Sequence, residues 1–161
     1  MNIYEFAMEK EAQSEALYRK LANSAVNQGM KNIFTMLANG EKRHYETILK
    51  MEKAENADLS RCKILDDSRD ILAKLRTGKE KFNLDGTQTD VYREARKSEE
   101  ASEKFYREKA RETNDEHHRK LFLTLAEEEF DHYTILDEII HMVGHPEAFL
   151  ENAEFNRRGS I

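Results

Sequence analysis

The sequence predicts an all-α protein, an antiparallel four-helix bundle with one long crossover between the second and third helices. Only six glycines and one proline occur in 161 residues, which disfavours a turn-rich β-sandwich or barrel. Four long segments have the hydrophobic spacing of amphipathic helices. The connection within each pair of segments is short, which predicts two helical hairpins, and the connection between the pairs is long.

The first hairpin is expected to consist of helices over residues 3–26 and 31–54. Asn2 stands at the N-cap position of the first helix, and Glu5 follows three residues later, as in a capping box. The polar segment Asn27-Gln28-Gly29 is expected to end this helix.

The crossover is expected over residues 55–90. It contains one short predicted helix over residues 67–76, closed by Thr77-Gly78, and then a polar loop around Asp85-Gly86-Thr87.

The second hairpin is expected to consist of a helix that starts after Asp90 and runs to about Glu112, and another over residues 115–143, stopped by Gly144 and Pro146. We expect one domain over residues 1–161, with a short C-terminal tail over residues 147–161.

Composition disfavours several classes of function. The chain has 26 Lys and Arg against 32 Asp and Glu, a net charge of −6, and no long basic block, so we expect no nucleic-acid partner. No apolar run approaches the roughly 18 residues of a transmembrane helix, and the N-terminus lacks a signal-peptide pattern. The single cysteine, Cys62, excludes an intramolecular disulfide and a four-cysteine metal site. A cytoplasmic protein is expected.

The sequence contains an internal repeat. Residues 4–45 match residues 92–133 without a gap after a shift of 88 positions. The identical pairs are Tyr4/Tyr92, Ala7/Ala95, Glu11/Glu99, Ser14/Ser102, Glu15/Glu103, Tyr18/Tyr106, Arg19/Arg107, Ala22/Ala110, Phe34/Phe122, Leu37/Leu125, Ala38/Ala126, Glu41/Glu129, His44/His132 and Tyr45/Tyr133.

Charged residues occupy positions that should face the bundle centre. The core stripe of the second helix is Phe34, Leu37, Glu41, His44, Ile48 and Met51, and that of the fourth is Phe122, Leu125, Glu129, His132, Leu136 and Ile139. Glu11 and Glu99 hold similar positions in the first and third helices.

Four buried carboxylates need compensation, because each unpaired one costs several kcal/mol. Two divalent cations would neutralise them. At spacing i, i+3, Glu41 and His44 can reach one ion, as can Glu129 and His132. A Glu from each of two helices and Glu-x-x-His from the other two is the ligand pattern of di-iron carboxylate bundles.

Tyr18 and Tyr106 lie two helical turns from Glu11 and Glu99, about 10 Å along the axis. Two interpretations are open: each hydroxyl donates a hydrogen bond to a metal ligand on another helix, or each ring is an ordinary core tyrosine.

With these motifs the chain resembles the rubrerythrin-like branch of the ferritin-like di-iron superfamily over nearly its whole length. The resemblance rests on Ala7-x3-Glu11-x6-Tyr18 and Glu41-Lys-Arg-His44 in one half, and on Ala95-x3-Glu99-x6-Tyr106 and Glu129-Phe-Asp-His132 in the other. The ending Glu151-Asn-Ala-Glu-Phe155 is also similar to tails in this group.

The resemblance implies that two iron ions bind, with manganese or zinc as substitutes. The ligands it implies are Glu11, Glu41, His44, Glu99, Glu129 and His132, with Glu41 and Glu129 serving one ion each or bridging.

The chain departs from rubrerythrins in two places. With Cys62 alone it cannot build the four-cysteine rubredoxin site, so electrons would come from a separate redox protein. Ser102 stands where rubrerythrins carry an extra Glu. Glu103 and its counterpart Glu15 either substitute for it or pair with Arg or Lys on the surface.

We therefore expect a non-haem di-iron oxidoreductase that reduces hydrogen peroxide or activates dioxygen. One alternative is a ferroxidase-like or iron-buffering protein without turnover, and another is a purely structural helical bundle. Related bundles commonly pair, so we expect a homodimer.

Overall fold

A computed structural model of the chain describes residues 1–77 and 86–144. The helices in this part are α1 (Ile3–Ser24), α2 (Gln28–Glu52), α3 (Ile64–Thr77), the 3-10 turn η1 (Gly86–Gln88), α4 (Thr89–Glu112) and α5 (Glu116–Gly144). The described residues contain no strand, and the all-α prediction is confirmed.

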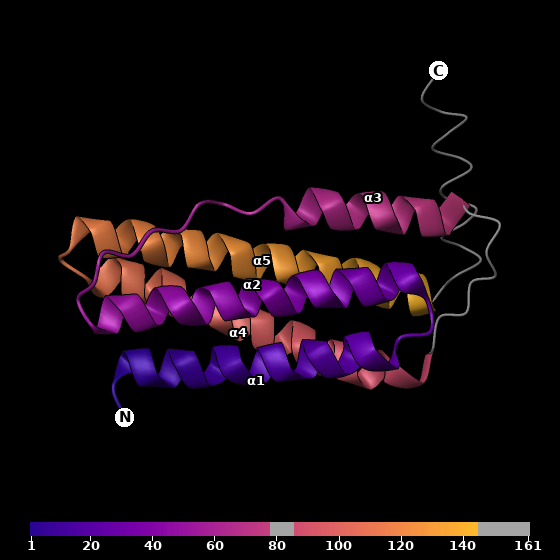
Figure 1. Cartoon of the computed structure of the whole chain (residues 1–161), viewed down its shortest axis with the longest axis horizontal. Helices are drawn as coiled ribbons and strands as arrows, with labels where there is room; N and C mark the ends of the chain where they lie inside the picture. Colours follow the sequence, from indigo (N-terminus) through magenta and orange to yellow (C-terminus); the bar gives the residue numbers. More distant parts are fainter. Residues whose placement is uncertain (78–85, 145–161) are drawn as a thin grey trace, which may run out of the picture.

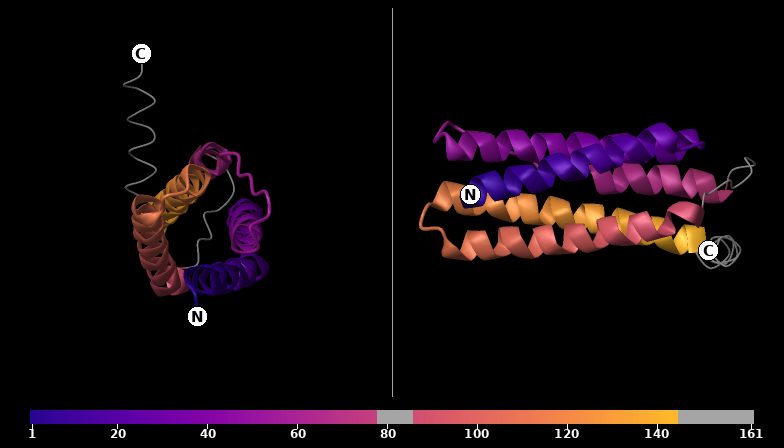
Figure 2. Two further views of the ribbon diagram at one scale, coloured as in Figure 1. Left: turned by 90° about the vertical axis from the view of Figure 1, so that its left-hand side faces the viewer. Right: turned by 90° about the horizontal axis from the view of Figure 1, so that it is seen from below.

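The four long helices form the predicted bundle (Figure 1). α1 packs against α2 and α4 packs against α5, each pair as an antiparallel hairpin. α3 lies along the outside and contacts α2 and α5, and the two further views in Figure 2 agree on this arrangement. The crossover that contains α3 runs from the end of α2 back along the bundle, so that α4 begins at the opposite end.

Local capping fixes where the first hairpin begins and turns. The Asn2 side chain accepts a hydrogen bond from the Glu5 backbone N–H at 2.8 Å, and the Glu5 carboxylate accepts one from the Asn2 N–H at 3.3 Å. This is the predicted capping box. Asn27, however, begins α2 rather than ending α1, because its side chain caps the Met30 N–H at 3.1 Å. Gly29 therefore lies inside α2.

The crossover differs from the prediction in two places. α3 begins at Ile64 rather than at residue 67, because the buried Ile64 side chain joins the core beside Leu72. The loop predicted around Asp85-Gly86-Thr87 includes a 3-10 turn, Gly86–Gln88, that leads directly into α4. The predictions at Gly78, Asp85, Pro146 and the 147–161 tail lie outside the described residues.

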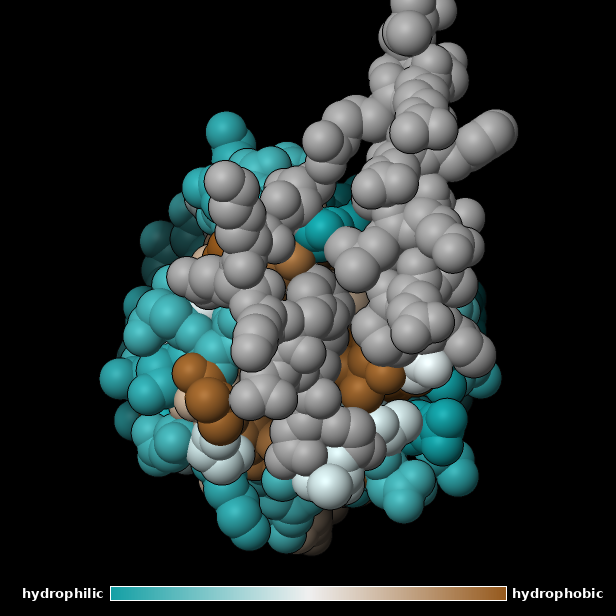
Figure 3. All heavy atoms as spheres, turned by 90° about the vertical axis from the view of Figure 1, so that its right-hand side faces the viewer, coloured by the Kyte–Doolittle hydropathy of each residue, from teal (hydrophilic) through white to brown (hydrophobic). Residues whose placement is uncertain are grey.

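Apolar residues form two clusters at opposite ends of the bundle. One contains Leu37 and Ile139, and the other contains Ile48 and Leu125. Figure 3, which looks onto one end of the bundle, shows hydrophilic residues around the rim and hydrophobic ones nearer the centre. No helix among the described residues has a stretch apolar and long enough to cross a bilayer. The two clusters enclose a polar layer at mid-height, which holds the predicted site.

Replacing Leu37 with Ala is expected to lower the free energy of unfolding by about 2–5 kcal/mol, because this side chain is 0% exposed and its loss leaves a cavity. Urea denaturation followed by circular dichroism measures the change. Leu123→Ala is the matched control, since Leu123 is 38% exposed and should lose well under half as much. Equal losses in the two variants would contradict this view of the core.

Candidate metal centre

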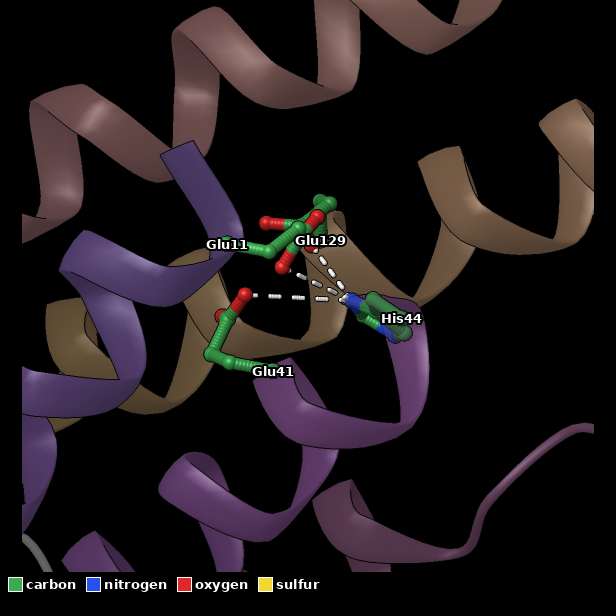
Figure 4. A group of neighbouring side chains, drawn as sticks. All are labelled: Glu11, Glu41, His44 and Glu129. Atoms are coloured by element: carbon green, nitrogen blue, oxygen red, sulfur yellow. Dashed lines mark hydrogen bonds and ion pairs between the residues drawn. The ribbon is translucent and has the colours of Figure 1, made fainter. Parts of the chain in front are cut away.

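All six predicted side chains converge in the polar layer. They form two adjoining groups whose candidate ligand atoms lie within 4.8 Å of one another. The first group is Glu11, Glu41, His44 and Glu129, and the second is Glu41, Glu99, Glu129 and His132. Figure 4 shows the first group, with three carboxylates directed toward the His44 ring. Glu41 and Glu129 belong to both groups, which is the arrangement of carboxylates that could bridge two ions.

Each long helix contributes to the layer. α1 supplies Glu11 and α4 supplies Glu99, one carboxylate from each hairpin. α2 and α5 each supply a Glu and a His one turn apart, on the face directed into the bundle. The sequence places these side chains inward because they continue the apolar stripe of each helix.

The histidines link the two hairpins. His44 Nδ1 on α2 lies 2.7 Å from Glu129 Oε1 on α5, and His132 Nδ1 on α5 lies 2.8 Å from Glu41 Oε1 on α2. The two imidazoles stack with their centroids 5.6 Å apart. Each Nδ1 atom therefore faces the carboxylates, where it could bind an ion as a neutral ligand.

Both tyrosine hydroxyls donate to a carboxylate on another helix, as one of the two interpretations predicted. Tyr18 donates to Glu99 Oε1 and Tyr106 to Glu11 Oε1, each at 2.5 Å. The rings are also buried in the apolar clusters, so the packing role holds at the same time. Burial and the neighbouring carboxylates raise the pKa of both hydroxyls well above 10, so both remain donors.

The second oxygens of Glu11 and Glu99 are well placed for a cation. Each Oε2 atom is buried and has no hydrogen-bond partner among the described residues. Glu11 Oε2 lies 3.5 Å from His44 Nδ1, on the side where three carboxylates meet. A buried carboxylate oxygen without a donor is costly, and a divalent cation would remove that cost. This donor set therefore fits a metal ion.

Without a metal, protons hold the carboxylates together. Burial, reinforced by the charge of Glu11, raises the pKa of both Glu41 and Glu129 well above the ordinary value of 4.5. Burial also acts to raise the pKa of Glu99, but the neighbouring Glu129 carboxyl and the His132 ring lower it to about 2. Two carboxyls thus keep protons that divalent ions would displace.

The sequence did not predict Glu128, which lies beside the core stripe. This buried carboxylate contacts His44 Nε2 at 2.9 Å and accepts hydrogen bonds from Arg43 at 3.1 Å and the Cys62 backbone N–H at 3.2 Å. Burial alone would raise its pKa, but its contacts with His44 and Arg43 lower the pKa to about 2. The carboxylate is therefore an acceptor for the His44 Nε2–H. Glu128 lies three residues after the buried Leu125, so a wider core stripe on α5 would have included it.

Glu15 and Glu103, the predicted alternatives for a missing ligand, form surface ion pairs. Glu15 lies 2.7 Å from Arg19, and Glu103 lies 2.9 Å from Arg107. Neither belongs to the two metal-competent groups. The surface interpretation of these residues is the one the structure shows.

Two cavities open beside the polar layer, between α1 and α4. Their volumes are about 390 and 420 Å³. The internal repeat relates their walls: Ala7, Ser102 and Tyr106 line one, and Ala95, Ser14 and Tyr18 line the other. Each cavity is thus lined in part by a tyrosine that donates to a cluster carboxylate.

Tyr106→Phe is expected to lower the free energy of unfolding by about 1–3 kcal/mol, since it leaves both oxygens of buried Glu11 without a donor. Tyr18→Phe should cost a similar amount through Glu99. Thermal or urea denaturation in the presence of EDTA gives the values. Tyr133→Phe, at a half-buried ring outside the cluster, is the control and should change stability little. Equal small effects in all three variants would argue against the two cross-helix bonds.

The metal-free protein is expected to lose stability as the pH rises above about 4.5, the ordinary pKa of a Glu carboxyl. Glu41 and Glu129 have raised folded pKa values, so their contribution is full below pH 4.5 and is lost as the pH rises through the folded pKa. His44 acts the same way above 6.5: burial acts to lower its pKa, but the Glu11 charge and the hydrogen bonds to the surrounding carboxylates together raise it well above the ordinary value. At acidic pH the protein is also expected to lose stability. Glu99 and Glu128 have lowered folded pKa values, so the stability that their charged forms contribute is lost as the pH falls from 4.5 toward 2.

Urea denaturation in EDTA at a series of pH values measures this profile. The variant Glu41→Gln plus Glu129→Gln should flatten the decline above pH 5, because both positions then stay neutral at every pH. The control variant Glu46→Gln plus Glu127→Gln, at exposed positions on the same helices, should show the same decline in stability as the wild type. A metal-free protein that becomes more stable between pH 5 and 8 would contradict the assignment.

Comparison with known proteins agrees with this geometry. A family model described as Rubrerythrin matches residues 2–140, a range that includes every member of the two groups. Neither the curated proteins nor the solved structures contain a match. Since the family model covers most of the chain and the bundle carries the carboxylate and histidine cluster at its centre, this chain belongs to the rubrerythrin family.

Proposed function

We propose that this protein holds two iron ions in its polar layer and reduces hydrogen peroxide with electrons from a separate redox protein. The observation that carries the proposal is the pair of four-residue groups that share Glu41 and Glu129. Two groups with two common carboxylates suit two neighbouring ions, whereas one isolated group would suit a single ion.

Charge and donor chemistry support the metal part of the proposal. Two divalent ions carry 2 × (+2) = +4, which balances the four carboxylates of the two groups at 4 × (−1) = −4. Carboxylate oxygen and imidazole nitrogen suit iron, and they also suit manganese and zinc. The partnerless oxygens of Glu11 and Glu99 would each gain a cation.

When bound, two ferrous ions would supply the two electrons that, with two protons, convert one hydrogen peroxide molecule into two water molecules. The side chains of the chain prepare the environment for that chemistry. Tyr18 and Tyr106 keep their protons and hold Glu99 and Glu11 in place. The apolar clusters above and below the layer exclude bulk water. On the α1–α4 side, the two cavities offer an approach for an oxidant of two heavy atoms.

The electron source is a separate protein in this proposal, because these 161 residues contain a single cysteine. That cysteine, Cys62, is exposed and its backbone N–H is used to hold Glu128. The two electrons taken by each peroxide would therefore be returned from outside this bundle.

The test begins with metal content. Protein produced in iron-rich medium is expected to bind two ions per chain, measured by elemental analysis. Glu41→Ala plus Glu129→Ala should bind none tightly, because both groups lose their shared carboxylates. Glu46→Ala plus Glu127→Ala removes two exposed carboxylates from the same helices and should still bind two. Unchanged metal content in the first variant would overturn the site.

Stopped-flow mixing with hydrogen peroxide tests the reaction itself. The diferrous protein should be oxidised roughly tenfold or more faster than free ferrous iron at the same pH and concentration. The exposed control variant should react like the wild type. A protein that binds two ferrous ions but is oxidised no faster than free iron would contradict peroxide reduction, and would instead favour iron buffering.

A further inference from the structure

The internal symmetry of the cluster breaks at one pair of positions. Glu41 and Glu129 are equivalent in the repeat, so the residues that precede them, Gly40 and Glu128, are equivalent as well. One half therefore presents a carboxylate where the other half presents no side chain. All six members of the two metal-competent groups and both tyrosines obey the symmetry, which makes this difference conspicuous.

On the Glu128 side, the histidine is fixed at both nitrogens. Glu128 Oε1 lies 2.9 Å from His44 Nε2, while Nδ1 of the same ring faces the carboxylates of the first group. Glu128 is itself held, because Oε2 accepts from Arg43 and from the backbone N–H of Cys62. A carboxylate behind a ligating imidazole fixes the ring orientation and tautomer and increases its basicity.

On the Gly40 side, the histidine has no such support. The hydrogen bond and ion pairs that His132 forms with described residues, to Glu41 and Glu99, all use its Nδ1 atom. The ring instead packs against bare backbone, since a Cβ at Gly40 would lie 3.1 Å from both Cε1 and Nε2 of His132. A glycine inside a helix costs roughly 1 kcal/mol relative to Ala, and this close approach explains its presence in α2.

We propose that the two metal positions are unequal: the position of Glu11 and His44 binds a divalent ion more tightly and fills first, and the position of Glu99 and His132 is the exchangeable one. This inference rests on the proposed metal function and deepens it by assigning an order of loading. Glu128 is a positioning residue that acts through His44. Loss of such a partner typically costs roughly 10–100-fold in metal affinity.

Calorimetric titration of the metal-free full chain with Zn²⁺ tests the inequality. The wild type should bind two ions in two resolved steps. Glu128→Gln keeps the shape of the side chain but removes its charge, and it should weaken the tighter step by roughly 10–100-fold while leaving the weaker step nearly unchanged. Glu127→Gln, the neighbouring exposed carboxylate, removes the same charge without touching His44 and should preserve both steps.

Nitrogen-15 NMR of labelled histidines in the wild-type chain identifies which position fills first. With one equivalent of Zn²⁺ the His44 Nδ1 resonance should shift before that of His132, and the His44 Nε2–H should be found bonded to an acceptor. In Glu128→Gln this order should disappear.

The possible results separate the two proposals. Failure of the wild type to bind Zn²⁺ would remove the proposed metal function together with the inference. Two equal binding steps in the wild type, or equal weakening of both steps in Glu128→Gln, would overturn the inference while the metal function stands.

Discussion

The neutralisation of four carboxylates at the centre of the bundle is the constraint on which the rest of the structure depends. Glu11, Glu41, Glu99 and Glu129 are at most 2% exposed, so each must find a proton, a hydrogen-bond donor or a cation. The protein uses the first two means itself: protons on two of the carboxyls and tyrosine hydroxyls on the other two. The apolar clusters at either end then supply the stability that this polar layer does not.

The same constraint explains why the bundle has its connectivity. A carboxylate from each hairpin must reach the histidine of the other, as His44 does with Glu129 and His132 with Glu41. The long crossover allows the two hairpins to pack against each other in an antiparallel orientation. It also contacts the polar layer directly, because the Cys62 backbone N–H donates a hydrogen bond to Glu128. The fold therefore positions the cluster through contacts between segments far apart in the sequence.

Periodicity was sufficient to predict the helices and the six converging side chains, because each continues an apolar stripe that had to face inward. It was not sufficient for features decided by contacts between segments. Asn27 could end one helix or begin the next, and its bond to the Met30 N–H decides this. Ile64 extends α3 because of burial in the core. Glu128 lies at the edge of its stripe, where only the position of His44 on another helix gives it a role.

The duplicated architecture has an evolutionary consequence. Two separate copies of one helical hairpin, paired about a two-fold axis, would carry the same residue at every equivalent site and could not distinguish one half of the centre from the other. Joining the copies in one polypeptide lifts that restriction, since each gene segment can then accept substitutions alone. Gly40 and Glu128 are such a difference between equivalent positions, one that two identical copies of a hairpin could not have.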